Sequence, residues 1–144
     1  MCNKVLQLLD EKFGKDTLIA LATSDNNIPS VRIVNSYYEN GCFYTVTHNS
    51  TLKMKQIKNN PLVSVCSEQW FTARGTAENL GYVCDPKNEA LINKLRNVFA
   101  EWYYNGHTNE SDPNTCILCI HLANGTLYHN GEKFEINFQI KNNG

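Results

Sequence analysis

Short β-rich runs separated by turn residues constrain the fold of this chain more than any other sequence feature. The strongest of these turn signals is Asn40-Gly41, a pair typical of two-residue hairpins. Asp25-Asn26-Asn27 marks an earlier turn, and Asn124-Gly125 marks a later one. The runs between such signals predict seven or eight strands, over residues 17–23, 30–38, 42–47, 62–66, 71–78, 115–122, 126–129 and 133–138.

Three segments have helical features instead. Apolar side chains recur at spacings of three and four over residues 3–13. A short helix over residues 52–58 follows Asn49 and Ser50, and either residue can cap it. A longer helix is expected over residues 86–102. Antiparallel strands in this number, with few helices, predict a mainly β (α+β) barrel or sandwich.

Length and composition favour one folded domain, residues 1–144. A chain of 144 residues with 42% hydrophobic residues is long enough to bury its own core. Its net charge of −1 gives no sign of a nucleic-acid or anionic-membrane binder. No apolar run approaches the roughly 20 residues of a membrane helix, and no export signal is apparent, so we expect a cytoplasmic protein.

The most informative stretch for function combines cations, hydroxyls and a helix start. Arg32 lies on a predicted strand, while Thr47, Ser50, Thr51 and Lys53 lead into a predicted helix. A helix start offers free backbone N–H groups and a positive dipole end, which suits a phosphate. The alternative is ordinary: helix-capping hydroxyls, a solvated lysine and a surface arginine.

Several segments, taken in order, resemble the pyridoxamine-5′-phosphate-oxidase-like family of flavin-binding split barrels, in particular its short general-stress-protein-26 branch. The segments that carry the resemblance are residues 17–23, 29–34, 43–47, 50–53 and 59–61. The resemblance implies a six- to eight-stranded antiparallel split β-barrel with flanking helices. It also implies flavin mononucleotide (FMN) as the cofactor.

The resemblance assigns roles to particular residues. Arg32 and Lys53 would hold the FMN phosphate, and Ser50 and Thr51 would add hydroxyl or backbone contacts. Thr47 would contact the flavin ring or the ribityl chain.

The resemblance also implies a homodimer with FMN at its interface. Ile33, Val34 and Asn35 would run beside the isoalloxazine ring and offer main-chain groups to its polar edge. Trp70 stands where family oxidases carry a polar flavin contact from the partner subunit, which is a departure from the family pattern.

The activity implied is less specific than the cofactor. True pyridoxamine phosphate oxidases carry a Trp and an Arg late in the chain, and this sequence has neither after residue 115, so we do not expect that reaction. We expect a flavin-dependent oxidoreductase acting on a small molecule or another cofactor, and no catalytic residue is identified. The alternatives are a flavin carrier without turnover and a haem-binding split barrel that uses His48 or His129.

Aromatic residues end the long predicted helix. Trp102, Tyr103 and Tyr104 either pack in the core or form the wall of a ligand pocket or dimer interface, since aromatic side chains are enriched at interfaces. The sequence leaves these two interpretations open.

The six cysteines are expected to be neither catalytic nor metal-bound. Cys42, Cys66, Cys116 and Cys119 lie in predicted strands and are expected to be buried, unreactive thiols. Cys116 and Cys119 have zinc-like spacing, but positions three apart on a strand point to opposite faces. The sequence therefore predicts no metal site.

Overall fold

Six antiparallel strands, β1 to β6, close into a barrel because β3 pairs with β2 on one side and with β6 on the other. The structure is a computed structural model that describes residues 3–139. A seventh strand, β7, extends the sheet beyond β6, outside the closed ring. The mainly β, antiparallel barrel predicted from the sequence is confirmed. The strands are β1 (Thr17–Asp25), β2 (Ile28–Glu39), β3 (Cys42–His48), β4 (Leu62–Ser67), β5 (Phe71–Tyr82), β6 (Thr115–His129) and β7 (Glu132–Asn137).

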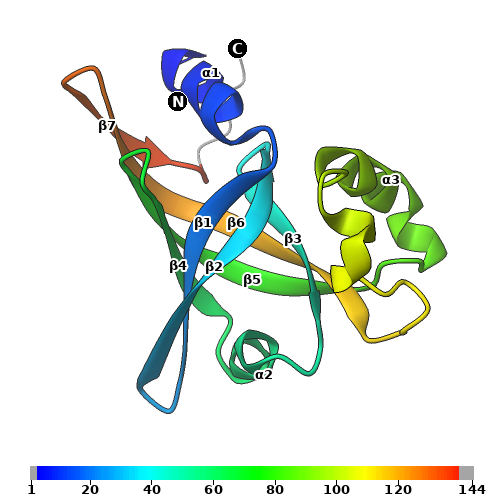
Figure 1. The fold of residues 1–144 in the computed structure, drawn as a ribbon. Coiled ribbons are helices and arrows are strands. Elements are labelled where there is room, and N and C mark those ends of the chain that lie inside the picture. The colour runs from blue at the N-terminus through cyan, green and yellow to red at the C-terminus, as the bar shows by residue number, and fades with distance from the viewer. Residues whose placement is uncertain (1–2, 140–144) are drawn as a thin grey trace.

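The helices lie at the ends and on the side of the barrel. Figure 1 shows α1 at one end, α2 at the other and α3 against the side. Among the described residues, no helix is long and apolar enough to cross a membrane. The helices are α1 (Asn3–Phe13), α2 (Leu52–Asn59) and α3 (Glu89–Val98).

Alternating side chains fill the barrel interior, as the two-residue period of a strand requires. On β4, for example, Val63 and Val65 are buried, whereas Cys66 faces outward. Helix α1 closes one end with Phe13, whose ring centroid lies 5.7 Å from that of Phe43 and 5.2 Å from that of Phe71. This aromatic cluster fixes α1 to the barrel end opposite α2.

Strand β6 runs without interruption, so the turn predicted at Asn124-Gly125 is wrong. A Cβ atom on Gly125 would lie 2.7 Å from the carbonyl oxygen of Thr72 and 2.9 Å from the Cβ atom of Ala73, both on β5. The glycine therefore permits a close approach of β5 and β6 instead of a turn.

The helix predicted over residues 86–102 is also wrong in its extent. A short 3₁₀ turn, η1 (Pro86–Asn88), precedes α3, and a π-type turn, η2 (Tyr103–His107), follows it. Within η2, Gly106 has a φ angle of +88°, which ends any helical continuation. We call residues 86–114 the cap. Its own small core, which includes barrel residues, consists of Val83, Ile92, Leu95, Phe99, Tyr103 and Ile117.

Strand β2 pairs with β3 only at its C-terminal end, and the part of β2 before Tyr37 is separated from β3. The ladder between the two strands consists of Tyr37 with Tyr44, Tyr38 with Phe43, and Glu39 with Cys42. Residues 33–35 of β2 have no partner residue on β3, although they still pair with β1. The barrel is therefore split between β2 and β3, and the candidate site lies at this split.

Candidate ligand-binding cleft

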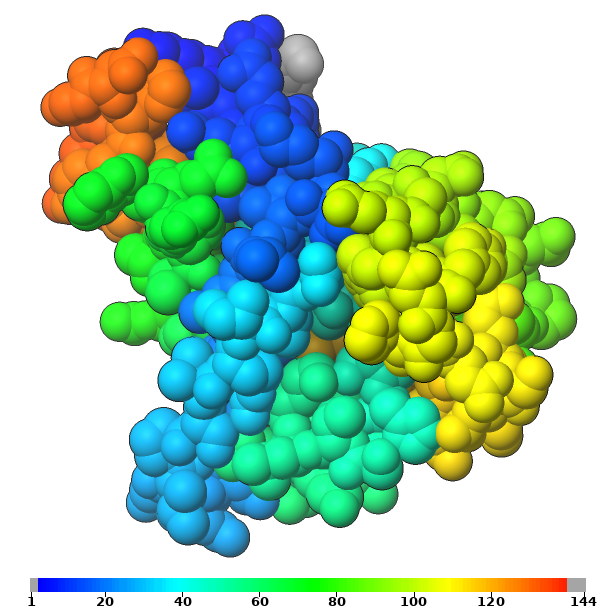
Figure 2. Space-filling view, in the orientation of Figure 1, coloured from blue at the N-terminus to red at the C-terminus, as the bar shows by residue number. Residues whose placement is uncertain are grey.

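A cleft of about 790 Å³ opens where β2 leaves β3. Strands β2 and β3, the start of α2 and residues 102–115 supply its walls. Figure 2 shows the surface hollowed between the cyan β2 region, the green α2 region and the yellow cap. The volume lies in the range of roughly 300–1,000 Å³ that is typical of small-molecule sites.

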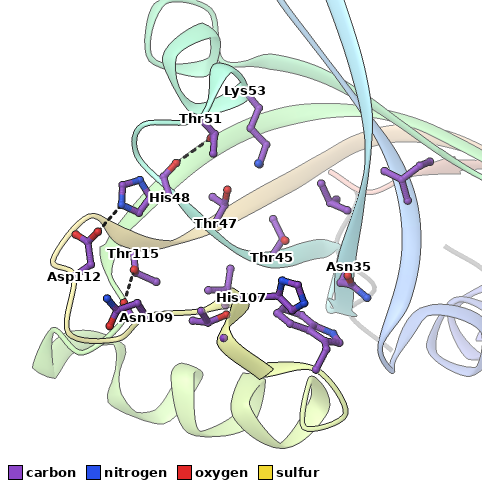
Figure 3. A pocket seen from close by; sticks show the side chains of 16 residues that line it. Asn35, Thr45, Thr47, His48, Thr51, Lys53, His107, Asn109, Asp112 and Thr115 are labelled. Atoms are coloured by element: carbon purple, nitrogen blue, oxygen red, sulfur yellow. Dashed lines mark hydrogen bonds and ion pairs between the residues drawn. The ribbon is translucent and has the colours of Figure 1, made fainter. Parts of the chain in front are cut away.

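Lys53, on α2, places a positive charge in this cleft. Its side chain lines the cleft and points into it (Figure 3). Burial lowers the pKa of Lys53, and the positive charge of the nearby Arg32 lowers it further. Within residues 3–139, neither cation has a carboxylate within 4.0 Å. The cleft therefore holds positive charge that an anionic ligand would neutralise.

A chain of hydrogen bonds fixes Arg32 relative to α2. The guanidinium donates to the Thr23 hydroxyl at 2.7 Å and to the Leu21 carbonyl at 3.2 Å. The Thr23 hydroxyl in turn donates to the side-chain oxygen of Gln56 on α2. Arg32 does not line the cleft itself, and it acts on Lys53 from the adjoining barrel interior.

The Asp16 carboxylate organises a second part of the cleft. One of its oxygens accepts a hydrogen bond from the Asn35 amide at 3.0 Å, and the other accepts from the Trp102 indole N–H at 2.9 Å. Asn35 on β2 and Trp102 in the cap both line the cleft. A single carboxylate thus holds the indole of the cap beside β2 and gives the cleft a fixed aromatic wall.

Hydroxyl groups line the strip between these two parts. Thr45 and Thr47 on β3, and Thr51 before α2, all border the cleft. The Thr51 hydroxyl donates to the His48 carbonyl at 2.9 Å, as Figure 3 shows. Such groups suit the polar chain of a ligand whose anionic end lies at Lys53.

His48 ties β3 to the cap. Its Nε2 atom lies 2.7 Å from a carboxylate oxygen of Asp112, and its Nδ1 atom lies 2.7 Å from the Ser50 hydroxyl. The backbone N–H of Asn114, followed by the contact with His48, lowers the pKa of Asp112. Both ring nitrogens of His48 are therefore already engaged within the chain.

The structure brings most of the predicted cofactor residues together. Arg32, Ser50 and Trp70 are the three that do not line the cleft. The Ser50 hydroxyl contacts His48 instead. The N-cap of α2 is Thr51, which makes no side-chain capping bond, so the predicted cap at Asn49 or Ser50 is wrong. The six that do line it are Ile33, Val34, Asn35, Thr47, Thr51 and Lys53.

Trp70 lies at the other end of the barrel. It stands in the turn between β4 and β5 with a φ angle of +64°, and its side chain is 74% exposed. Its neighbour Gln69 donates a hydrogen bond to the Lys12 carbonyl of α1, which places this turn at the end opposite α2. Trp70 therefore cannot reach the cleft of its own chain.

Sequence reasoning missed most of the cap's contribution. His107, Thr108, Asn109 and Asp112 line the cleft, yet the sequence assigned none of them to a site. Asp112, for example, meets His48 of β3 across 64 residues of chain, and no local sequence pattern predicts such a contact. Of the three aromatic residues at the end of the predicted helix, only Trp102 lines the cleft.

The cysteines differ in part from the expected burial. Cys116 and Cys119 are buried, but Cys42 is half-buried and Cys66 is exposed, so the prediction is wrong for Cys66; Cys2 lies outside the described residues. Burial raises the pKa of Cys116 to about 11, as expected of an unreactive thiol. A hydrogen bond from Cys119 instead lowers the pKa of Cys42 to about 6.

Comparisons with known proteins give the family. The family model for pyridoxamine 5′-phosphate oxidase matches residues 6–129, and the chain belongs to this family. General stress protein 26 of Bacillus subtilis (strain 168) is 29% identical in an alignment of 140 residues that covers 95% of this chain and 94% of that protein. The crystal structure of General Stress Protein 26 from Bacillus anthracis strain Sterne is 19% identical, with a TM-score of 0.71 over 92% of this chain and 98% of that one.

Two other solved structures share the fold but differ in ligand. An FAD-binding protein from Mesorhizobium loti is 16% identical, with a TM-score of 0.63 over 83% of this chain and 90% of that one. A haem-binding protein from Mycobacterium smegmatis is 14% identical, with a TM-score of 0.62 over 86% of this chain and 54% of that one. At these identities the likeness concerns the fold alone.

Proposed function

We propose that this chain binds FMN in the cleft, with the phosphate at Lys53. The observation that carries the proposal is the unpaired positive charge of Lys53. Lys53 lines the cleft, Arg32 lies nearby, and within residues 3–139 no carboxylate pairs with Lys53. A phosphate monoester brings about −1.5 to −2 charges and strong acceptor oxygens. Charge-assisted hydrogen bonds to such oxygens are among the strongest in proteins.

The rest of the cleft suits a flat, polar-edged ring. Residues 33–35 of β2 have no partner residue on β3, so their main chain offers hydrogen-bonding groups to a ring edge. The indole of Trp102 supplies an aromatic surface, and the hydroxyls of Thr45 and Thr47 suit a ribityl chain. A bound flavin would supply electron and hydride transfer, while the protein binds and orients it.

The family and one relative of the same fold support a flavin, and the activity proposed is that of an FMN-dependent oxidoreductase. Its substrate is a small molecule or another cofactor. The sequence after residue 115 has neither Trp nor Arg, so we propose a reaction other than pyridoxamine phosphate oxidation. A flavin carrier without turnover is the alternative.

Haem is the second candidate, because histidines line the cleft and the Mycobacterium smegmatis relative binds haem. An axial ligand needs a free ring nitrogen. Both nitrogens of His48 are engaged by Ser50 and Asp112. His129 pairs with Glu132 at the β6–β7 hairpin, and it does not line the cleft. Among the described residues, His107 is then the histidine of the cleft left to bind the iron. FMN needs no axial ligand and agrees with the family match, so FMN is preferred.

We further propose that a second copy of the chain completes the site. Leu18, Val31 and Ile33 are 57%, 68% and 64% exposed on one face of β1 and β2, next to the cleft. Exposed apolar patches of this kind mark interaction surfaces. Trp70, exposed at the far end of the barrel, would then contact the flavin of the partner, as the resemblance implies.

Ligand titration tests the cofactor assignment. Apoprotein should quench FMN fluorescence, and Lys53→Met should weaken FMN binding by about 10- to 100-fold, the equivalent of a charged hydrogen bond of about 1.5–3 kcal/mol. Riboflavin, which lacks the phosphate, should bind both proteins about equally. Lys55→Met is the matched control, because Lys55 is exposed on the same helix and does not line the cleft.

Equal losses for FMN and riboflavin would show that Lys53 acts through folding and not through the phosphate. A haem absorbance spectrum from the purified protein, without any response to FMN, would promote the second candidate. Anaerobic reduction of the bound flavin by NADH or NADPH, followed by turnover with an acceptor, would separate an oxidoreductase from a carrier.

Sedimentation measurements test the dimer. The wild-type protein should sediment as a dimer, and Val31→Glu should shift it toward the monomer and weaken FMN binding. Val31 suits this test because it is exposed and does not line the cleft. A stable wild-type monomer that binds FMN tightly would refute the interface placement.

A further inference from the structure

A cluster of metal-ligating side chains lies on the outer face of the barrel, where β3, β6 and β5 run side by side. The registers place Cys42 opposite His121, and Cys119 opposite Glu78. Side chains two residues apart on a strand share a face, so all four project from the same surface. The alternate residues on β3 and β6, such as Phe43, are fully buried in the barrel.

The distance from Cys42 to His121 matches a tetrahedral metal site, and the Cys119 sulfur lies beside the other nitrogen of the same ring. The Cys42 sulfur lies 3.5 Å from Nδ1 of His121, and the Cys119 sulfur lies 3.5 Å from Nε2 of the same ring. One ligand atom from each of the three residues lies within 4.8 Å of the others. Zinc bonds of about 2.3 Å to sulfur and 2.0–2.1 Å to nitrogen, at tetrahedral angles, separate sulfur from nitrogen by about 3.5 Å.

We propose that Cys42, Cys119 and His121 bind a zinc ion on the outer face of the barrel. Thiolate and imidazole ligands together favour zinc over the hard cations calcium and magnesium. The side chain of His121 is 52% exposed, so solvent can reach the ion and supply a fourth ligand. The proposal departs from the sequence-based expectation that no cysteine binds a metal.

Glu78 gives the cluster the second layer of a metal site. Its carboxylate lies 2.9 Å from Nε2 of His121. When a histidine binds zinc through one ring nitrogen, the other commonly donates to a carboxylate, which fixes the ring and strengthens the ligand. Binding through Nδ1, the nitrogen next to Cys42, leaves Nε2 to Glu78 in this way. The Cys119 side chain, now 3.5 Å from Nε2, would turn toward the ion at Nδ1.

The strand geometry favours a metal over a disulfide. Cys42 lies opposite His121, so Cys119 is its diagonal neighbour across the β3–β6 ladder. Diagonal neighbours have Cα atoms about 7–8 Å apart. A disulfide needs a separation of about 4.4–6.8 Å and would require backbone movement. A metal ion bridges the longer gap without such movement.

The proposed zinc site is separate from the flavin cleft. Cys42 begins β3 and His48 ends it. The cleft extends along β3 as far as Thr45, which is three residues, or about 10 Å of extended strand, from Cys42. None of the four cluster residues lines the cleft. Zinc binding and FMN binding can therefore be measured independently.

Metal titration of the full-length protein tests the site. The flavin-free, untagged protein is reduced with a phosphine, freed of metal and titrated with cobalt(II) as a spectroscopic probe. We expect a thiolate-to-cobalt charge-transfer band that zinc displaces, and one zinc ion per chain after equilibrium dialysis and elemental analysis.

Variants identify the ligands. Cys42→Ser and His121→Ala should each abolish the band, and Glu78→Gln should weaken zinc binding by about 10- to 100-fold. Cys66→Ser is the matched control, because it removes an exposed strand cysteine outside the cluster and should change nothing. His121→Ala alters an exposed side chain, so it remains informative if Cys42→Ser fails to fold.

Two results would overturn the proposal. One is the absence of a charge-transfer band in folded, reduced wild-type protein, or a band that survives both Cys42→Ser and His121→Ala. The other is a Cys42–Cys119 disulfide that forms in air at the same rate with and without zinc.

Discussion

Arg96 in the cap and Lys53 in the cleft are both partly buried cations, but only Arg96 has an anionic partner. Its guanidinium donates to both carboxylate oxygens of Glu110, at 2.8 and 3.1 Å, and to the Asn93 side chain at 2.7 Å. The Tyr103 hydroxyl adds a hydrogen bond of 2.7 Å to the same carboxylate. Lys53 instead faces another cation, Arg32.

The pKa values report this difference. The hydrogen bond with Glu110 raises the pKa of Arg96, whereas burial and Arg32 lower that of Lys53. The bidentate pair of Arg96 and Glu110 is structural, because it holds the loop that carries Glu110 against α3. A half-buried cation beside another cation costs stability, and an anionic ligand offsets that cost.

The largest expected effect comes from giving Lys53 an internal partner. Thr47→Glu places a carboxylate in the wall of the cleft and makes the site resemble that of Arg96. The new carboxylate would repel the FMN phosphate, and repulsion between like charges costs several kcal/mol, so FMN affinity should fall by at least about 100-fold. Thr47→Gln is the matched neutral control, and riboflavin should lose much less than FMN. Similar losses with Glu and Gln would mean that bulk, not charge, blocks the cleft.

The second effect is on stability. Arg96→Met should lower the free energy of unfolding by about 1–3 kcal/mol, because it removes charged hydrogen bonds and leaves Glu110 without its partner. Lys53→Met should leave stability unchanged or raise it, because it removes repulsion with Arg32. Urea denaturation of the two variants and of the wild type measures the contrast. Equal destabilisation by both variants would contradict the view that Arg96 stabilises the fold and that Lys53 serves a ligand.

A smaller effect is expected from inorganic phosphate. If Lys53 and Arg32 attract phosphate, the free anion at about ten times its Kd should stabilise the apoprotein by about 1.4 kcal/mol through linkage. The melting temperature would rise by a few degrees, and Lys53→Met should abolish the rise. Chloride at matched ionic strength is the control, and an equal rise with chloride would point to general screening.

The smallest effect should appear at acid pH. The hydrogen bond from Arg96 holds the pKa of Glu110 below its ordinary value of 4.5. Glu110 therefore contributes its full stability above pH 4.5, and the contribution is lost as pH falls through the lowered pKa. Wild-type protein should lose stability more steeply than Glu110→Gln between pH 5 and pH 3. Parallel pH profiles would contradict the pairing.

The local patterns of the sequence determined the elements and part of the site. Apolar periodicity placed α1 over residues 3–13, as the structure has it. The strands also fell near their expected places, except that residues 115–122 and 126–129 belong to the single strand β6. The run from Thr47 to Lys53 was predicted to lie near a phosphate because it combines hydroxyls, a helix start and a lysine. Such features depend on neighbouring residues, so the sequence alone reveals them.

Only the tertiary structure decided how these elements meet. Gly125 has the sequence signature of a turn, but its missing Cβ serves the close approach of β5 and β6. Asp112 reaches His48 across 64 residues of chain, and Asp16 reaches Trp102 across 86. The β3–β6 register places Cys42 opposite His121 across 79 residues. Strand register and cap docking depend on the packing of the whole core. Local patterns in the sequence therefore could not decide whether Trp102 packs in the core or forms a ligand-pocket wall, and they could not reveal the cysteine–histidine cluster.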